Sequence, residues 1–201
     1  GAGLFARSLW NLGAAGLGLQ RDNLFLVDVR PSARTPQALR QFWHRAMERI
    51  STLPAVHSAA LAGDAVFGNG GWNQDIWIDR GELAPTTAKV SDNVVSAGFF
   101  ATAGIPVLMG REFTERDREG APLAALVNQT FARQHYGEEN PIGKRFGDRG
   151  SVSKTRYEIV GVVGDAKYGT VREPIRPMAF YPLLQYPPRG ALVLHARASQ
   201  E

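Results

Sequence analysis

The chain has 201 residues, 44% of them apolar and 21% charged, and it contains no cysteine. These proportions are typical of a globular protein, so they exclude a disordered tail, a collagen-like rod, a disulfide scaffold and any site built on thiolates. The net charge is +4, and most of the excess lies in residues 141–176. We interpret this segment as a solvated basic loop, with anionic lipid headgroups or nucleic acid as less favoured partners, because no recognisable nucleic-acid module is present.

The N-terminal residues 1–22 differ from the rest because they are rich in glycine, alanine and leucine. The first twenty residues carry one charge, Arg7, and four apolar side chains can share one helical face: Leu4, Phe5, Leu9 and Leu12. The segment is either an amphipathic helix or the outer end of a transmembrane helix whose apolar body lies upstream. We favour the second interpretation, because Trp10 stands where an interfacial aromatic is expected. No apolar stretch reaches the roughly 18 residues that span a bilayer, so the sequence as given contains no complete transmembrane helix.

A strand–helix–strand pattern follows. Residues 24–29 form a predicted strand, Thr35 and Pro36 have the types of an N-cap and a first helical residue, and the helix is expected to reach about Thr52. Residues 56–62 are small and apolar, as in a second strand. The spacing of apolar residues predicts a buried helix face made of Leu39, Phe42, Trp43, Ala46, Met47 and Ile50. The unit predicts two parallel strands joined by a right-handed crossover.

The middle of the chain predicts a mixed set of short elements. Helices are expected over Ser96 to Ala103, at Thr114 to Asp117 and, capped by Asn128, over Gln129 to Tyr136. The predicted strands are Trp72 to Ile78, Thr87 to Val95, Leu123 to Val127, Tyr157 to Val163, Met178 to Leu184 and Ala191 to Ala196. Because the last strand has no expected partner, we interpret the domain as incomplete and interrupted by an insertion.

The sequence offers no assembled catalytic or ligand-binding motif. His44 and Glu48 have a metal-compatible spacing but no second pair, and the glycines at 68, 70 and 71 precede a predicted strand rather than a helix. No G-x-S-x-G elbow is present. Asn128 begins a glycosylation sequon, but a helix cap is the better interpretation. We therefore assign no catalytic, cofactor-binding or metal-binding residue, and the residues favour a binding or mechanical domain over an enzyme.

An ordered series of motifs resembles the MacB-like periplasmic core domains of ABC transporter permeases related to MacB and FtsX. Each motif is weak alone, but together they run in family order over about residues 4 to 197. They are Val90 to Phe100, Gly104 to Phe113, Ala125 to Ala132, Asn140 to Phe146, Tyr157 to Asp165 and Tyr181 to Leu183.

The resemblance implies an α+β fold. It implies that residues 1–22 are the end of the first transmembrane helix and a helical stalk. It also implies a porter-like βαβ subdomain made of residues 23–64 and 186–201, incomplete at its C-terminal side. A β-rich, Sabre-like subdomain over residues 65–185 would be inserted into it.

The family function is mechanotransmission: a cytoplasmic ATPase hydrolyses ATP, and this extracytoplasmic domain couples the motion to export or to a partner protein. The resemblance therefore implies a non-catalytic periplasmic domain without cofactors, anchored in the inner membrane. Its expected partners are the ABC ATPase, a second permease copy, and an adaptor or exported substrate, but not nucleic acid. Exposed aromatics of the insert, Phe67, Trp72 and Trp77, are candidate partner contacts, although core packing is their commoner role. Two alternatives stay open: an extracytoplasmic ligand- or lipoprotein-binding domain, and an enzyme whose site is assembled from scattered residues.

Overall fold

The computed structural model describes residues 5–7, 23–33, 35–65, 72–80, 83–148, 156–167, 174–186 and 192–198. Its three helices are α1 (Pro36–Ser51), α2 (Phe99–Ala103) and α3 (Gln129–Tyr136). The strands are β1 (Phe5–Arg7), β2 (Leu24–Val29), β3 (Val56–Ala62), β4 (Trp72–Arg80), β5 (Leu83–Val95), β6 (Val107–Gly110), β7 (Ala124–Asn128), β8 (Arg145–Asp148), β9 (Tyr157–Val163), β10 (Met178–Pro182) and β11 (Leu192–Ala198). Within these ranges, no helix has the length and apolar character needed to cross a membrane.

Helix α1 begins where its sequence predicts. The Thr35 hydroxyl accepts a hydrogen bond from the amide of Ala38 at 3.2 Å, and Pro36 occupies the first helical position, where no backbone donor is needed. Leu39 and Trp43 are buried, and the other apolar residues of the predicted face are partly buried. Capping and periodicity are local signals, which explains why this prediction is confirmed.

Strands β2 and β3 run parallel, as predicted, but they are not neighbours. Strand β11 lies between them and pairs antiparallel with both, for example Leu194 with Val27 on one side and with Leu61 on the other. The expectation of a final strand without a partner is therefore wrong. The last described strand fills the centre of a small sheet made of β1, β2, β11 and β3.

The N-terminal segment contributes a strand where it is described. Phe5–Arg7 pairs antiparallel with β2, with Phe5 opposite Asp28, so these residues are not part of the expected helix. The rest of residues 1–22 lies outside the described residues.

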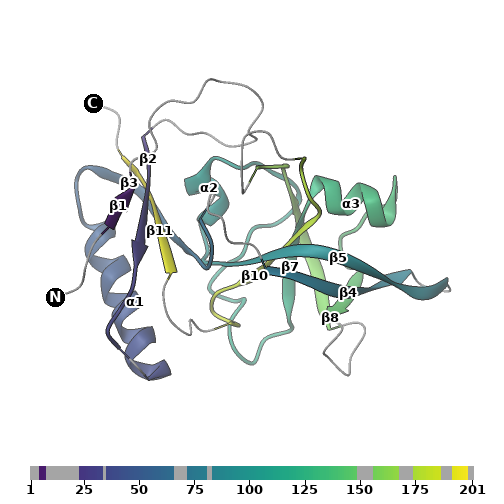
Figure 1. Cartoon of the computed structure of the whole chain (residues 1–201), viewed down its shortest axis with the longest axis horizontal. Coiled ribbons are helices and arrows are strands. Elements are labelled where there is room, and N and C mark those ends of the chain that lie inside the picture. Colours follow the sequence, from purple (N-terminus) through teal and green to yellow (C-terminus); the bar gives the residue numbers. More distant parts are fainter. Residues whose placement is uncertain are drawn as a thin grey trace.

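The remaining strands close into a ring. In spatial order, β5, β10, β7, β9, β8 and β4 are hydrogen-bonded neighbours, and β4 pairs again with β5. Strand β6 pairs with β9 beside this ring. Figure 1 shows α1 and the small sheet at one end of the molecule, the β4–β5 hairpin and α3 toward the other, and α2 between them. Strands β6 and β8 were not predicted, because their stabilising pairs come from distant parts of the chain.

Two predicted helices differ in the structure. Helix α2 starts at Phe99 rather than Ser96, since the Ser96 hydroxyl instead accepts a hydrogen bond from the amide of Leu61 at 2.9 Å. The expected helix at Thr114 is a turn. The Asp117 carboxylate accepts hydrogen bonds from the amide of Thr114 at 2.8 Å and from the guanidinium of Arg111 at 2.7 and 2.8 Å. This clamp closes the segment on itself, and the helix does not propagate.

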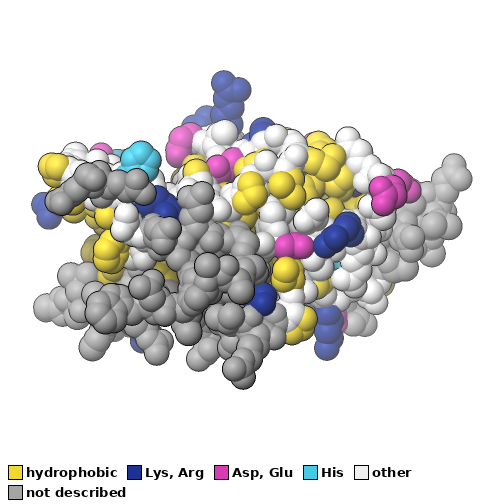
Figure 2. Space-filling view, turned by 90° about the horizontal axis from the view of Figure 1, so that it is seen from above, with side chains coloured by type: hydrophobic (Ala, Val, Ile, Leu, Met, Phe, Trp, Pro, Cys, Tyr) yellow, Lys and Arg dark blue, Asp and Glu magenta, His cyan; other side chains and the backbone are white. Residues whose placement is uncertain are grey.

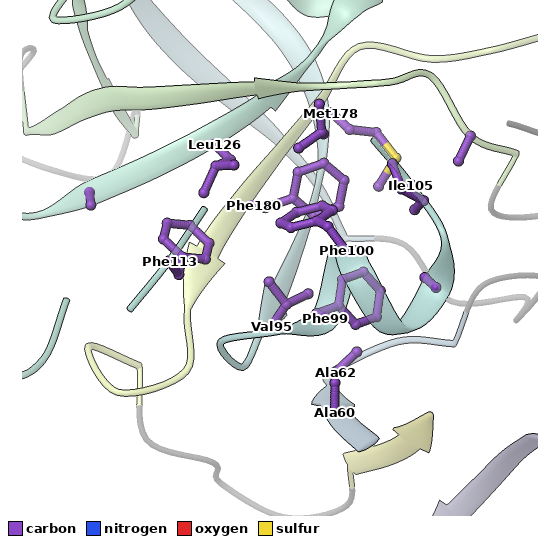
Figure 3. Packing of buried hydrophobic residues seen from close by; sticks show 14 of the residues in the cluster. Ala60, Ala62, Val95, Phe99, Phe100, Ile105, Phe113, Leu126, Met178 and Phe180 are labelled. Atoms are coloured by element: carbon purple, nitrogen blue, oxygen red, sulfur yellow. The ribbon is translucent and has the colours of Figure 1, made fainter. Parts of the chain in front are cut away.

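Three groups of buried side chains hold the fold together. One lies between α1 and the small sheet, around Trp43, Leu61 and Leu194. A second fills the ring with residues from all six of its strands: Ile76, Val90, Val127, Phe146, Ile159 and Tyr181. The third, which we name the shared core, joins Leu26, Ala60 and Ala62 of the small sheet to Phe99 and Phe100 of α2 and to Leu126, Val163 and Phe180 of the ring. In Figure 3, Phe100 lies between Phe99 and Phe180, and Ala62 lies beside Phe99.

Candidate functional site

The structure describes the three predicted partner-contact residues to different extents. Phe67 lies outside the described residues. Trp72 begins strand β4, and its side chain is outside the described part of the chain. Trp77 lies in the middle of β4, between the fully buried Ile76 and Ile78.

Trp77 faces the outside of the ring. Side chains alternate along a strand, and Ile76 and Ile78 point into the ring. The Trp77 side chain is partly exposed, and its register partners are Thr87 of β5 and Gly147 of β8. A large aromatic beside a glycine on an outer sheet face can supply contact area to another protein.

The N-terminus of α3 is the described helix end best suited to bind an anion, but a side chain already occupies it. One carboxylate oxygen of Asp165 accepts hydrogen bonds at 2.8 Å from the Thr130 amide and the Asn128 side-chain amide. The other accepts from the Thr130 hydroxyl at 2.8 Å, and Arg133 lies 3.4 Å from it. Asn128 in turn caps the helix through the amide of Phe131 at 3.0 Å. This network orients α3 on β7 and β9 and leaves Asn128 only 1% exposed. The predicted helix cap at Asn128 is confirmed.

The basic side chains described near β8 have acidic or aromatic neighbours. Lys144 pairs with Glu139, Arg145 pairs with Glu158 at 2.9 Å, and the Arg156 guanidinium lies 5.4 Å from the centre of the Tyr157 ring. Figure 2 shows acidic and basic side chains interspersed on the face that it presents, rather than gathered in a stripe. This arrangement supports a solvated surface over a nucleic-acid interface.

The histidines form no metal site among the described residues. His44 and Glu48 make an exposed contact of 3.3 Å on α1. His195 is fully buried in β11, edge-on to Phe99 with 5.0 Å between ring centres. Burial lowers the pKa of His195 to about 4, so this side chain is neutral at physiological pH and packs as part of the core.

Two acidic residues with raised pKa values, Asp64 and Asp92, were not singled out from the sequence. Asp92 lies in β5, and one oxygen of its carboxyl, Oδ1, is buried without a hydrogen-bond partner. Burial raises the pKa of Asp92 to about 7, and the charge of Asp64 contributes to the same shift. Burial also raises the pKa of Asp64. A signal was available, since the polar residues Ser91, Asp92 and Asn93 stand together between Val90 and Val94 of β5.

The small sheet meets the ring at a place that we name the joint (residues 61–64 and 93–96), which includes Asp64 and directly follows Asp92 in β5. Ala62 of β3 pairs with Val95 of β5, and the Gly63 amide donates to the carbonyl of Val94 at 2.8 Å. The Asn93 side chain accepts from the Asp64 amide and donates to the Asp64 carbonyl, both at 3.0 Å. Among the described residues, the joint is therefore built from one strand pair, a few backbone hydrogen bonds and one polar clamp.

Comparison with protein families gives one match that covers most of the chain. The family described as the MacB-like periplasmic core domain matches residues 12–199. Among curated proteins, the macrolide export ATP-binding/permease protein MacB of Bdellovibrio bacteriovorus is 30% identical over 56 residues. That match covers 28% of this chain and 8% of the relative, so the chain spans only a small part of that protein's length.

Solved structures share the fold at low sequence identity. The periplasmic region of MacB from Actinobacillus actinomycetemcomitans aligns with a TM-score of 0.58 and 13% identity, covering 89% of this chain and 76% of that one. A domain of a permease from Porphyromonas gingivalis aligns with a TM-score of 0.53 and 16% identity, over 77% of this chain and 66% of that one. The extracellular domain of the transporter YknZ from Gram-positive bacteria gives 0.51 and 14%, over 78% and 72% of the two chains.

Proposed function

We propose a function from one premise: this chain belongs to the family of MacB-like periplasmic core domains. It is the extracytoplasmic domain of an ABC transporter permease, and it carries movement driven by a cytoplasmic ATPase to an exported substrate or partner protein. The observation that carries this proposal is the family match, which runs through the small sheet and the ring alike. In this role the domain itself performs no chemistry. It acts in a membrane-anchored permease.

The arrangement of the two parts supports a mechanical role. We assign the small sheet with α1 to a porter-like part, residues 23–64 and 186–201, and the ring to a Sabre-like part, residues 65–185. The shared core fills the space between them with side chains that are 0–8% exposed. A closely packed interior transmits displacement rather than absorbing it, so a push on the small sheet moves the ring with it.

The same packing weighs against the alternative of a ligand-binding groove between the two parts. Phe99, Phe100 and Phe180 occupy that region and are no more than 1% exposed. A hollow on the described surface is lined by Glu115, Arg116, Arg118, Glu119, Gly120 and Ala121, all from one loop and not from both parts.

A disulfide across the joint tests rigid transmission. Ala62 and Val95 are register partners, both buried, in a chain without natural cysteine, so the double variant Ala62→Cys/Val95→Cys can form only the intended bond within the domain. We expect the oxidised transporter to export at the rate of its reduced form, because the two parts already move together. If oxidation stops export and reduction restores it, the two parts must move relative to each other, and rigid transmission is wrong.

Partner docking at the outer face of the ring is tested separately with Trp77→Ala in the full-length transporter. We expect export to fall while ATPase turnover in detergent is kept, because the change removes contact area far from the ATPase. The matched control is Phe25→Ala, which removes an aromatic that is 50% exposed on the small sheet. Unchanged export with Trp77→Ala would remove this face from the docking proposal.

A further inference from the structure

We propose that the exposed side of helix α1 is a membrane contact, in which Arg45 and Arg49 bind the phosphates of anionic lipid headgroups and Leu53 enters the interfacial layer beside them. The inference rests on three features of the described residues: arginines without acidic partners, an exposed leucine next to them, and the place of α1 at one end of the molecule. The choice of a membrane over an acidic protein rests on the proposed function, which brings a bilayer close to this domain.

The arginines of α1 have no acidic partner among the described residues. The helix carries Arg40, Arg45 and Arg49, all of them exposed, and a single acidic residue, Glu48. The Glu48 carboxylate contacts His44 at 3.3 Å, so the one negative charge of the helix is already engaged. Guanidinium groups that are left without a counter-charge on one element create a positive surface, which attracts anions.

Most other described arginines are held by a neighbouring group. In four ion pairs the guanidinium nitrogen lies 2.7 to 3.4 Å from a carboxylate oxygen. These pairs are Arg30 with Asp28, Arg111 with Asp117, Arg133 with Asp165 and Arg145 with Glu158. Arg116 and Arg118 stand in an exposed loop together with Glu115 and Glu119, so acidic and basic residues are mixed there. Positive charge without nearby acidic residues is therefore a particular property of α1.

Arg45, Arg49 and Leu53 form one stripe along the helix. Residues four apart on a helix are neighbours on its surface, so the two guanidinium groups reach the same side. Leu53 follows four residues later, just past the C-terminal end of α1, and is 51% exposed. Cations next to an exposed apolar side chain are typical of helices that lie on anionic bilayers. Arginine suits this role because its guanidinium can donate two parallel hydrogen bonds to one phosphate.

The position of α1 allows it to lie along a flat surface. Its inner side, with Leu39 and Trp43, packs on the small sheet, and the arginines occupy its exposed side. Figure 1 shows α1 on the outside of the small sheet, at the end of the molecule away from the β4–β5 hairpin. A membrane contact through α1 holds the ring away from the bilayer, where a partner protein or substrate can reach Trp77.

Co-sedimentation of the 201-residue chain with lipid vesicles tests the proposal. At about 0.05 M salt, we expect binding to phosphatidylcholine vesicles that contain about a quarter of phosphatidylglycerol, and far weaker binding to pure phosphatidylcholine. Raising the salt to about 0.5 M should release most of the bound protein, because screening shortens the range of the charge interaction.

Two double variants with the same loss of charge separate a local contact from the net charge of the chain. Arg45→Gln/Arg49→Gln should weaken binding about 25-fold, because each arginine close to an anionic surface contributes about fivefold. The matched control, Arg116→Gln/Arg118→Gln, removes two exposed arginines from the loop and should weaken binding by no more than about twofold. All four side chains are exposed, and circular dichroism checks that each variant is folded.

The apolar part of the contact has its own variant. Leu53→Ser should weaken binding severalfold but leave the salt dependence unchanged, because it removes apolar area and no charge.

Three results would overturn the proposal. One is the absence of binding to the anionic vesicles at low salt, which would leave an acidic protein surface as the partner to test. Another is an equal loss of binding in the two double variants, because net charge alone would then explain the attraction. The third is unchanged binding by Arg45→Gln/Arg49→Gln. The export assay with Trp77→Ala is independent of these measurements, so a failed lipid contact and a failed transport role are distinguishable.

Discussion

The shared core predicts that one buried ring determines the stability of both parts of the molecule. Phe100 is fully buried, edge-on to Phe99 and Phe180 with ring centres 5.3 and 5.0 Å away. The neighbours of Phe100 come from α2, the ring and the small sheet. We therefore expect Phe100→Ala to weaken both parts together.

The magnitude follows from the burial. Truncating a fully buried phenylalanine to alanine costs about 3–5 kcal/mol, which includes the cavity left behind. With a urea dependence near 2.5 kcal/mol per molar, a loss of about 4 kcal/mol lowers the urea midpoint by about 1.6 M. The matched control Phe25→Ala removes a side chain that is 50% exposed and should cost under about 1 kcal/mol.

Urea unfolding followed by hydrogen exchange in β3 and in β7 gives one readout in each part of the molecule. The expected result for Phe100→Ala is a single transition, displaced equally at both strands. Separate transitions, or a shift confined to the ring, would show that the shared core does not couple the two parts. That outcome would also remove the main physical support for rigid transmission.

Three further results are expected. Gly161→Ala should destabilise by about 1–3 kcal/mol, because a Cβ atom there would lie 2.4 Å from the carbonyl oxygen of Arg111; an unchanged urea midpoint would contradict this. Burial raises the pKa of Asp117, but the hydrogen bonds from Arg111 and the Thr114 amide together lower it by more, so the net shift is downward. Asp117→Asn should therefore cost about 1–2 kcal/mol at neutral pH and progressively less as the pH falls through that lowered pKa, and an equal cost at acid pH would refute the pairing. His195 has a pKa lowered to about 4 by burial, so the unfolded chain binds its proton first. As the pH falls from about 6.5 to about 4, the unchanged protein should therefore lose up to about 1.4 kcal/mol of stability per pH unit. His195→Leu should not show this loss.

Elements with local signals were predictable from the sequence. The Thr35–Pro36 start of α1, the ends of β2, β3 and β9, and the Asn128 cap of α3 each depend on neighbouring residues. The expected end of α2 at Ala103 is also local, since the next residue, Gly104, has a φ of 69°, which glycine adopts readily at a helix terminus.

Elements that depend on distant partners were not predictable. Strand β8 is only four residues long and is held by β4 and β9. The position of β11 between β2 and β3, and the closure of the ring through the β4–β5 pair, leave no mark in local periodicity. The helix predicted at Thr114 is a turn for a related reason: Asp117, the fourth residue of that segment, is bound by Arg111.

The candidate surface was only partly predictable. Aromatic residues of the insert were singled out by type, and alternation along β4 places Trp77 outward. The raised pKa of Asp92 needed the structure, because the burial of this residue depends on the pairing of β5 with β4 and β10.

The place of β11 also has a consequence for biosynthesis. Strands β2 and β3 bond to β11 rather than to each other, and β11 is synthesised after every strand of the ring. Because the chain is made from its N-terminus onward, β2 and β3 lack their shared partner strand until nearly all of the domain has left the ribosome. Strand pairing across such a separation is slow, and unpaired edges are prone to aggregate. A ribosome stalled before residue 192 would hold a chain whose described ring strands are complete but in which β2 and β3 lack the strand that joins them.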